Sequence, residues 1–447
     1  MRLLRRRCGS ADDRELVRLA VPALGALAAG PLYTLADTAI VGHLGTRQLA
    51  ALALASTIVA AITQLSDFLS YTTTAQVARL HGAGREREAG GVAAQALWLS
   101  LTTGVVIGIA LAALSSPAAR ALDGSGAGVA ALTARYVALS AIGLPGMLIA
   151  LAGEGFLRGI SDLRTPLRIL VACNAANVVL EVGLVYGLHL GLDGSAVGTV
   201  VAQLAMGILF ARHMLAAPAD RRRPALARIR PLVRMGAHLT VRSAALLGAF
   251  LLASALAARI GAASLGAHQI AFELYIFLAL VLDAIAIAGQ IIIARRLGSG
   301  DGAGARQAAR RMIGWALAVG LLFALVLLAG TDLIPRAFSS DPAVWGRAAS
   351  AWPLFALMQP VAAVVFALDG ILIGAGDSRY LAGAMVVSLA VFVPVALAAS
   401  SLAGLWIALD VLMLARLLTL AGRFARGRWA VLGAPGVAEA AAGSGGA

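Results

Sequence analysis

The sequence is short of charge, and it contains no lysine at all. Of its 447 residues, 13% are charged and 60% are hydrophobic. Soluble domains are roughly half apolar and about one quarter charged. A chain with so little charge and so much apolar surface cannot have water as its main solvent, which excludes an ordinary soluble protein.

Cysteine is almost absent, and no catalytic motif is present. Cys8 and Cys173 are too few for a disulfide framework or a metal site. There is no Walker loop, no metal-ligand cluster and no nucleophile pattern. The sequence therefore predicts a protein that is not an enzyme, with no catalytic residues, no metal and no cofactor. Without an ATP-binding segment, transport by this chain would draw on an ion gradient or be passive.

The net charge of +14 comes from arginines, and these lie at the ends of apolar runs. Connections rich in arginine alternate with connections poor in it, which by the positive-inside rule places both termini in the cytoplasm. This distribution indicates membrane topology and contact with anionic lipids rather than nucleic-acid binding. We expect a multi-pass protein of the inner (plasma) membrane, with no nucleic-acid partner and no cleavable signal peptide.

The apolar runs are long and continuous. A span needs about 20 mostly apolar residues, because each backbone polar group must be satisfied within its own helix in lipid. The short alternating strands of a membrane barrel are absent. The predicted fold class is all-α integral membrane, with 12 transmembrane helices in two six-helix bundles. The expected spans are 16–41, 49–77, 92–114, 132–157, 167–188, 196–214, 232–257, 265–293, 312–329, 345–373, 380–399 and 402–420.

The two halves of the sequence match when one is shifted by about 216 positions. Residues 78–84 recur as 294–300, and Asp67 falls on Asp283. Because each bundle has an even number of spans, six, both bundles have the same orientation in the membrane. A pseudo-two-fold axis along the membrane normal therefore relates them. Such duplication is typical of transporters that hold substrate between the halves. The predicted domains are an amino-terminal lobe (1–215), a cytoplasmic linker (216–231), a carboxyl-terminal lobe (232–424) and a disordered tail (425–447).

Ionisable side chains inside a span cost at least about 2.5 kcal/mol on insertion scales, so each one is a candidate functional residue. Asp37 lies about four turns after Pro22, in a helix that Pro22 and Pro31 allow to bend. One interpretation is that protonation or ion occupancy of Asp37 changes that bend. The alternative is a solvated acid near the outer mouth of the span.

A second acid, Glu181, shares one helix face with Asn177, four residues earlier. An amide beside a buried carboxyl group can act as a hydrogen-bond partner or as a cation ligand. Thr199 of the next helix could reach the same cavity. The alternative is that Asn177 and Thr199 only hold helices together, as polar side chains do in membrane bundles.

The remaining intramembrane acids are either repeat-equivalent pairs or single acids. Repeated acids favour a structural role, such as pairing with an arginine or latching a cytoplasmic turn. A single acid is either a pocket residue or a paired acid. The pairs are Asp67 with Asp283 and Glu154 with Asp369, and the single acids are Glu273 and Asp410.

Three stretches of the chain together carry a family resemblance. The first is the helix with Pro22 and the run 35–45, which includes Asp37; the others are the turns 75–79 and 155–166. From about 16 to 420 the chain resembles the multidrug and toxic compound extrusion (MATE) family, in its DinF-like branch. The resemblance implies two six-helix bundles that open alternately to either side. It also implies export of amphipathic, often cationic, compounds in exchange for protons or sodium ions.

In that branch the coupling residues lie in the amino-terminal lobe. The family's usual fifth-helix aspartate is Glu181 here, one methylene longer, which favours protons over sodium ions as the coupling ion. Glu273 in the second lobe is expected to contribute to the substrate pocket, with apolar walls. The matching ion-coupling positions are Asp37, Asn177, Glu181 and Thr199, with Tyr33 and Pro22 beside them as substrate-binding or gating positions.

We therefore expect an antiporter for multidrug efflux that works as a monomer, with amphipathic small molecules and membrane lipids as its partners. One alternative is a flippase for lipid-linked precursors or polysaccharides in the same superfamily, although such proteins often carry extra spans and cationic cavity residues. A membrane-embedded enzyme acting on lipid would need polar catalytic residues clustered at one interface. A passive channel would give no reason for asymmetric buried acids.

Overall fold

The computed structural model describes residues 11–122 and 129–433, and every regular element in these residues is helical. In lipid, long helices satisfy the backbone polar groups of apolar segments from within. The elements are α2 (Ala11–Gly42), α3 (Thr46–Ser66), α4 (Phe68–Gly82), α5 (Glu86–Leu122), α6 (Val129–Ser140), η1 (Ala141–Gly143), α7 (Leu144–Gly159), α8 (Arg164–Val182), η2 (Gly183–Gly187), α9 (Leu192–Ala216), α10 (Leu226–Ile260), α11 (Ala262–Gly298), α12 (Gly302–Ala329), α13 (Leu333–Phe338), α14 (Pro342–Gly374), α15 (Ser378–Leu397) and α16 (Leu402–Ala425).

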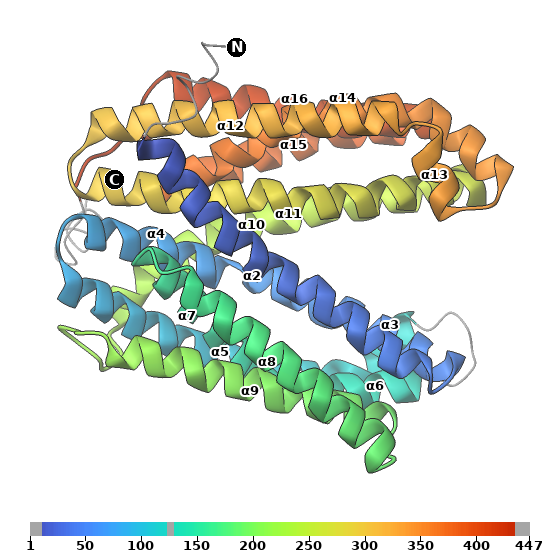
Figure 1. The fold of residues 1–447 in the computed structure, drawn as a ribbon, viewed down its shortest axis with the longest axis horizontal. Coiled ribbons are helices and arrows are strands. Elements are labelled where there is room, and N and C mark those ends of the chain that lie inside the picture. The colour runs from blue at the N-terminus through green and yellow to red at the C-terminus, as the bar shows by residue number, and fades with distance from the viewer. Residues whose placement is uncertain (1–10, 123–128, 434–447) are drawn as a thin grey trace. The chain divides into compact units, whose positions relative to one another are not determined.

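Twelve helical segments of the described chain are long and apolar enough to cross a membrane. This confirms the predicted all-helical membrane fold with 12 spans (Figure 1). Three spans combine two elements: α3 meets α4 at Asp67, α6 meets α7 through the turn η1, and α8 continues into the π-helical turn η2.

Glycines with positive φ fix turns at equivalent places in the two halves. Gly45 (φ 126°) precedes α3, and Gly261 (φ 140°) precedes α11. Gly84 (φ 72°) and Gly300 (φ 81°) lie in the turns before α5 and α12. Residues with a side chain disfavour such angles. The members of each pair are 216 positions apart, so the repeat in the sequence is also a repeat in backbone geometry.

The described chain divides into two compact units. The amino-terminal unit is Gly25–Gly236, and the carboxyl-terminal unit contains 11–24 and Ala237–Gly433. Each unit has its own apolar core, which includes Phe210 in the first and Trp406 in the second. The lobe and linker boundaries expected from the sequence stay a prediction.

α7 and α14 are the central helices of their units. α7 packs against α4, α5 and α9, whereas α14 packs against α11, α12 and α16. Gly155 of α7 faces the Ser70 carbonyl, and a Cβ there would lie 2.5 Å from that oxygen. Gly370 of α14 faces the Ala286 carbonyl in the same way, at 2.3 Å. In both units the close approach of two helices therefore requires a glycine at the equivalent position.

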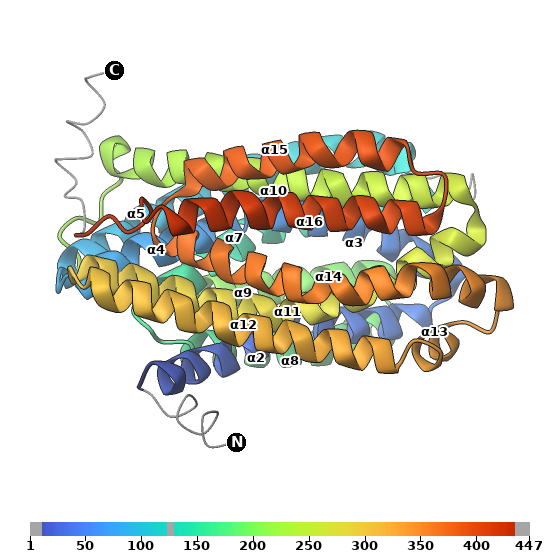
Figure 2. The ribbon, with the colours of Figure 1, turned by 90° about the horizontal axis from the view of Figure 1, so that it is seen from above.

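α13 and α15 also contact α14. α15 runs alongside α16, as Figure 2 shows, and α12 runs alongside α11.

The disordered tail predicted from residue 425 begins too early, because described residues after 425 are packed against the protein. Trp429 is 2% exposed and stacks on Phe424, and the Gly433 N–H donates to the Leu297 carbonyl at 2.8 Å. The rest of that predicted tail, 434–447, lies outside the described residues.

The first turn of α2 is bound in the carboxyl-terminal unit by ion pairs. Asp13 is 5% exposed and accepts hydrogen bonds from Arg311 (3.0 Å) and from the Trp315 indole N–H (3.0 Å). Three carboxylates of α2 thereby meet three arginines of α11 and α12. The other pairs are Asp12 with Arg296 and Arg311, and Glu15 with Arg295 and Arg296.

α2 is shared between the two units. Its residues up to Leu24 pack in the carboxyl-terminal unit, and those from Gly25 onward pack in the amino-terminal unit. The helix continues through both Pro22 and Pro31. In the described chain α2 makes few close backbone approaches to other helices, so side-chain contacts at its two ends position it.

The ion-pair cluster leads to a first prediction. Asp13→Asn lowers the free energy of unfolding by about 1–3 kcal/mol, because Arg311 and Trp315 lose an ionised acceptor. Thermal denaturation of the purified protein in detergent measures the change. Asp332→Asn, which alters an exposed carboxylate, is the matched control and leaves the midpoint unchanged. Equal midpoints for the two variants would show that the cluster does not hold α2.

Candidate functional site

Asp37 of α2 lies in a polar cluster inside the amino-terminal unit. The Ser195 hydroxyl of α9 donates a hydrogen bond to Asp37 Oδ1 at 2.8 Å. Asp37 is 5% exposed and Ser195 is fully buried. The described residues show no ion pair between Asp37 and an arginine, and the hydrogen-bond partner of Asp37 is a neutral hydroxyl.

Glu181 of α8 is fully buried in the same cluster. Its carboxyl group lies beside the carboxyl group of Asp37 and the hydroxyl group of Ser195, close enough for direct interaction. Neither Glu181 oxygen makes a hydrogen bond of normal geometry with another described residue. Two carboxyl groups from different helices therefore share one buried space.

Asn177 lies one turn before Glu181 on the same face of α8, and it is 2% exposed. Its Oδ1 atom would lie 3.2 Å from a Cβ placed on Gly198 of α9. Because Gly198 has no side chain, α9 can approach α8 closely at this level. The Asn177 oxygen makes no hydrogen bond with another described residue, which leaves it available to a ligand or a water molecule.

The cluster also contains hydroxyl groups from three helices. The Tyr33 hydroxyl of α2 and the Thr199 hydroxyl of α9 are 2.8 Å apart, a hydrogen-bond distance. Tyr136 of α6 is 5% exposed and lies within interaction range of Asp37, Ser195 and Thr199. The structure thus brings together the predicted residues Asp37, Glu181, Asn177, Thr199 and Tyr33.

Three helices contribute to the site in the same way. Residues four positions apart lie on one helix face. α2 presents Tyr33 and Asp37, α8 presents Asn177 and Glu181, and α9 presents Ser195 and Thr199. Asp37, Glu181 and Ser195 lie together in the buried cluster, and the second residue of each pair lies one helical turn away.

Sequence reasoning missed two residues of this cluster. Ser195 has the i, i+4 spacing to Thr199 that would have suggested it. Tyr136 gave no comparable signal, since it is a single aromatic residue in an apolar span. Both become visible only when α6 and α9 are placed against α2.

Side chains of α8 and η2 hold the second half of α2 in place. Asn174 Nδ2 donates to the Ala29 carbonyl at 3.1 Å, and the Tyr186 hydroxyl donates to the Ile40 carbonyl at 2.5 Å. Ile40 is in the last turn of α2, where carbonyl groups have no partner within the helix. Tyr186 belongs to the π-helical turn η2, an irregularity that is frequent at functional sites.

Two predicted residues lie outside the cluster. Pro22 is in the part of α2 that packs in the carboxyl-terminal unit. Glu273 is an exposed residue of α11 in that same unit, where it accepts a hydrogen bond from Gln269 Nε2 at 2.7 Å. Their predicted roles in gating and substrate binding stay predictions. No group of three or more His, Cys, Asp or Glu side chains in the described chain is arranged to hold a metal ion.

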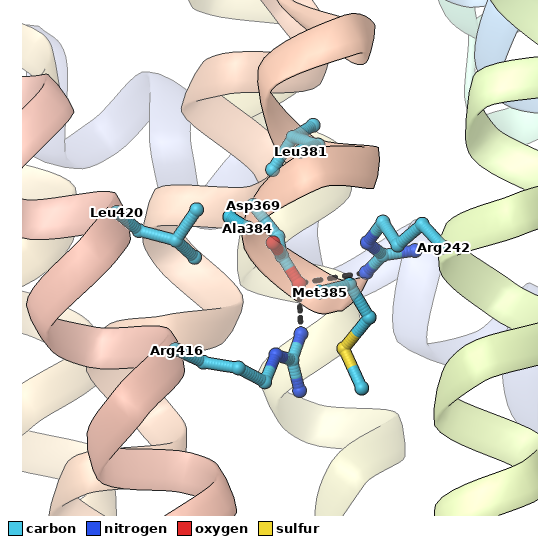
Figure 3. A pocket seen from close by; sticks show the side chains of 7 residues that line it. All are labelled: Arg242, Asp369, Leu381, Ala384, Met385, Arg416 and Leu420. Atoms are coloured by element: carbon cyan, nitrogen blue, oxygen red, sulfur yellow. Dashed lines mark hydrogen bonds and ion pairs between the residues drawn. The ribbon is translucent and has the colours of Figure 1, made fainter. Parts of the chain in front are cut away.

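A second buried acid, Asp369 of α14, has entirely different partners. Its Oδ2 atom accepts hydrogen bonds from Arg242 of α10 (2.6 Å) and Arg416 of α16 (2.5 Å), as Figure 3 shows. Charge-assisted bonds of this kind are stronger than neutral ones. Asp369 therefore has a structural role that joins three helices, and its suggested part in latching a cytoplasmic turn stays a prediction.

The repeat-equivalent acid in the amino-terminal unit is neutralised by a different arginine. Glu154 of α7 pairs with Arg158 of the same helix at 2.5 Å. Arg158 also donates to the Ser70 hydroxyl of α4 at 3.0 Å. Both equivalent acids are thus structural ion-pair partners, whereas Asp37 and Glu181 lie beside each other and beside neutral groups.

Comparison with known proteins agrees with these features. The family model MatE matches the chain twice, over residues 22–182 and 239–398. The chain belongs to the MatE family. The two matches begin 217 positions apart and end 216 positions apart, which agrees with the repeat found in the sequence. Members of the family are multidrug efflux transporters in the membrane and are not enzymes.

Curated relatives cover nearly the whole chain. Protein DETOXIFICATION 44, chloroplastic, of Arabidopsis thaliana is 31% identical over 94% of this chain and 84% of its own length. DNA damage-inducible protein F of Escherichia coli is 29% identical, over 93% of each chain. These relatives agree with the predicted resemblance to the DinF-like branch.

Solved structures share the fold. A structure described as MATE in the bent conformation has a TM-score of 0.84 at 20% identity and covers 98% of both chains. A transporter of the MOP superfamily from Pyrococcus furiosus, described as having a binding pocket of reverse polarity, also has a TM-score of 0.84, at 20% identity over 95% of this chain and 97% of its own.

The ion pairs of Asp369 lead to a second prediction. Asp369→Asn destabilises the protein by about 3 kcal/mol or more, because two buried guanidinium groups lose their shared anion. Asp377→Asn, which removes a part-exposed pair with Arg423, costs about 1 kcal/mol or less. Thermal denaturation of both variants makes the comparison. An Asp369→Asn protein of full stability that has lost transport would instead assign Asp369 a role in coupling.

Proposed function

We propose that the protein exports amphipathic, cationic compounds in exchange for protons, and that Asp37 and Glu181 are the residues that exchange the protons. The observation that supports this most directly is the pairing of two buried carboxyl groups whose neighbours are neutral. Ser195, Asn177 and the Tyr33–Thr199 pair supply hydroxyl and amide groups but no positive charge.

Electrostatics explains why this arrangement suits proton exchange. Two like charges a few ångströms apart repel each other strongly in a medium of low dielectric constant. Carboxyl pairs of this kind therefore tend to hold one proton between them. A proton can be bound or released here with a small structural change, whereas Asp369 is bound by two arginines of neighbouring helices.

A cationic substrate and the proton compete for the same negative charge. When the pair is deprotonated, the amino-terminal unit attracts a lipophilic cation. When a proton enters from the outer side, that attraction is lost and the substrate is released outward. The relatives include proteins named Multidrug resistance protein PmpM, of Pseudomonas aeruginosa, and Probable multidrug resistance protein NorM, of Thermotoga maritima, which supports a small-molecule substrate class.

α2 connects the site to the rest of the molecule. It carries Asp37 near one end and the ion-paired residues Asp12, Asp13 and Glu15 near the other, and its two parts pack in different units. Pro22 and Pro31 each remove a backbone hydrogen bond, so a change at Asp37 can bend the helix. This supports alternating access with Pro22 as a gating position. We further propose that Glu273 contributes to the substrate pocket of the second unit.

We place the protein in the plasma membrane, with both termini in the cytoplasm, acting as a monomer among membrane lipids. The coupling ion is the proton, and no further cofactor takes part. Sodium is the other candidate ion, because Asn177, Thr199 and the two carboxyl groups could together offer oxygen ligands. The experiment below separates the two ions.

The test is uptake of a fluorescent cationic dye into inverted vesicles that contain the full chain, under an imposed proton gradient or sodium gradient. We expect uptake with the proton gradient alone. Asp37→Asn and Glu181→Gln each reduce uptake at least tenfold, because a single carboxyl group cannot maintain the exchange. Asp193→Asn, which removes a surface pair with Arg135, is the matched control and retains uptake.

Other outcomes identify the error. Uptake driven by sodium and abolished by both substitutions would assign sodium to the same site. Uptake that survives both substitutions would move the coupling site elsewhere. Absence of uptake for every dye, with a well-folded protein, would contradict the proposed substrate class.

A further inference from the structure

The connection between α9 and α10, residues 217–225, carries three consecutive arginines on the surface of the amino-terminal unit. Arg221, Arg222 and Arg223 are exposed, and no ion pair joins any of them to an acid in the described part of the chain. The neighbouring acid, Asp220, pairs with Arg228 at 2.6 Å. Three positive charges are therefore grouped on this surface, and no acidic side chain of the described residues forms an ion pair with them.

This connection is fixed on the surface of α5 by hydrogen bonds. The Asp220 N–H donates to the Arg87 carbonyl (3.0 Å), and the Trp98 indole N–H donates to the Arg222 carbonyl (3.0 Å). Gln95 is fully buried and bonds twice: its amide donates to the Arg223 carbonyl (3.1 Å), and its oxygen accepts from the Ala225 N–H (2.8 Å).

Two glycines of α5 allow this close contact. A Cβ on Gly90 would lie 2.0 Å from the Pro218 carbonyl oxygen, and a Cβ on Gly91 would lie 2.1 Å from Asp220 Oδ1. The backbone of the connection is thereby held against α5, while the three arginine side chains remain exposed. Of the three, Arg222 also donates to the Ala217 carbonyl at 3.3 Å.

The geometry of α5 sets the level of the arginines relative to a membrane. Between Trp98 and Arg120 the helix has no charged residue. The stretch from Trp98 to Ala119 is 22 residues long, or about 33 Å at 1.5 Å per residue, close to the 30 Å of a hydrocarbon core. Trp98, which is 38% exposed, thus lies at the boundary where tryptophan is enriched.

Apolar groups lie next to the charges at this boundary. Leu226, the first residue of α10, is 81% exposed, and Leu101 of α5 is 36% exposed one turn beyond Trp98. The carbonyl groups of Arg222 and Arg223 bond to side chains at Trp98 and one turn before it. The arginines therefore lie at headgroup level, with apolar surface for acyl chains beside them.

We infer that Arg221, Arg222 and Arg223, held on α5 by Gln95 and Trp98, form a binding site for the phosphate headgroup of an anionic phospholipid. The positive charges complement the phosphate, the fixed backbone preorganises them, and Trp98 with Leu226 contacts the acyl region. This inference does not depend on the transport activity. It makes the connection a specific lipid site rather than a general mark of topology.

The test measures phospholipid binding to the purified full chain by native mass spectrometry, with dioleoyl phosphatidylglycerol as probe and dioleoyl phosphatidylcholine as the zwitterionic comparison. Replacing Arg221, Arg222 and Arg223 together with Gln lowers affinity for phosphatidylglycerol by about a hundredfold, at roughly 1 kcal/mol per arginine. Binding of phosphatidylcholine is unchanged.

Two controls separate a built site from net charge. Replacing Arg306, Arg310 and Arg428 with Gln removes the same charge from exposed positions of the other unit, and affinity for phosphatidylglycerol stays within about twofold. Gln95→Leu keeps every arginine but releases the connection, and we expect a severalfold loss of affinity. Thermal denaturation verifies that each variant is folded.

Three results would overturn the inference. An equal loss in both arginine triple variants would show a dependence on net charge alone. Unchanged binding by folded Gln95→Leu would show that the connection is not a preorganised site. Full displacement of the lipid by millimolar glycerol phosphate would identify a site for small soluble phosphates instead.

Discussion

A charged group among apolar helices must find a partner, and this requirement shapes the interior of both units. At Asp369 the partners are two arginines from neighbouring helices, and the ion pairs join α10, α14 and α16. At Asp37 and Glu181 the neighbours are the Ser195 hydroxyl and the carboxyl group of the other acid. The first arrangement is fixed, whereas the second can be satisfied by gaining a proton.

The same contrast explains how a duplicated chain can be functionally asymmetric. Glycines recur at equivalent turns and at equivalent helix contacts, such as Gly155 with Ser70 and Gly370 with Ala286. The backbones of the two halves are therefore built alike. The charges are not, because the position equivalent to Asp37 is Ala253, which is fully buried. Duplication supplied the scaffold, and single side chains made one unit the candidate coupling unit.

α2 has a special position in this scheme. In the described chain α2 and α10 both have residues in each compact unit, and α2 has its ion pairs at one end and Asp37 towards the other. Few close backbone approaches hold it, so its position depends on side chains such as Asp13, Ser195 and Tyr186. A helix held by polar contacts at its ends can shift when one of those contacts changes charge.

Hydrophobic length and helical periodicity are local properties of the chain, so the helical class, the 12 spans, the duplication and the i, i+4 pair Asn177–Glu181 could be predicted from the sequence. The family resemblance joined Asp37 to the group of Asn177, Glu181 and Thr199 and added Tyr33 beside them. Tertiary structure decided which helix faces meet: Ser195 and Tyr136 join Asp37, and Arg242 and Arg416 join Asp369. It also decided that the chain from 425 to Trp429, which had been predicted as part of a disordered tail, is packed, since Trp429 stacks on Phe424. These contacts join residues that are far apart in the chain or placed by packing, and no periodic pattern encodes them.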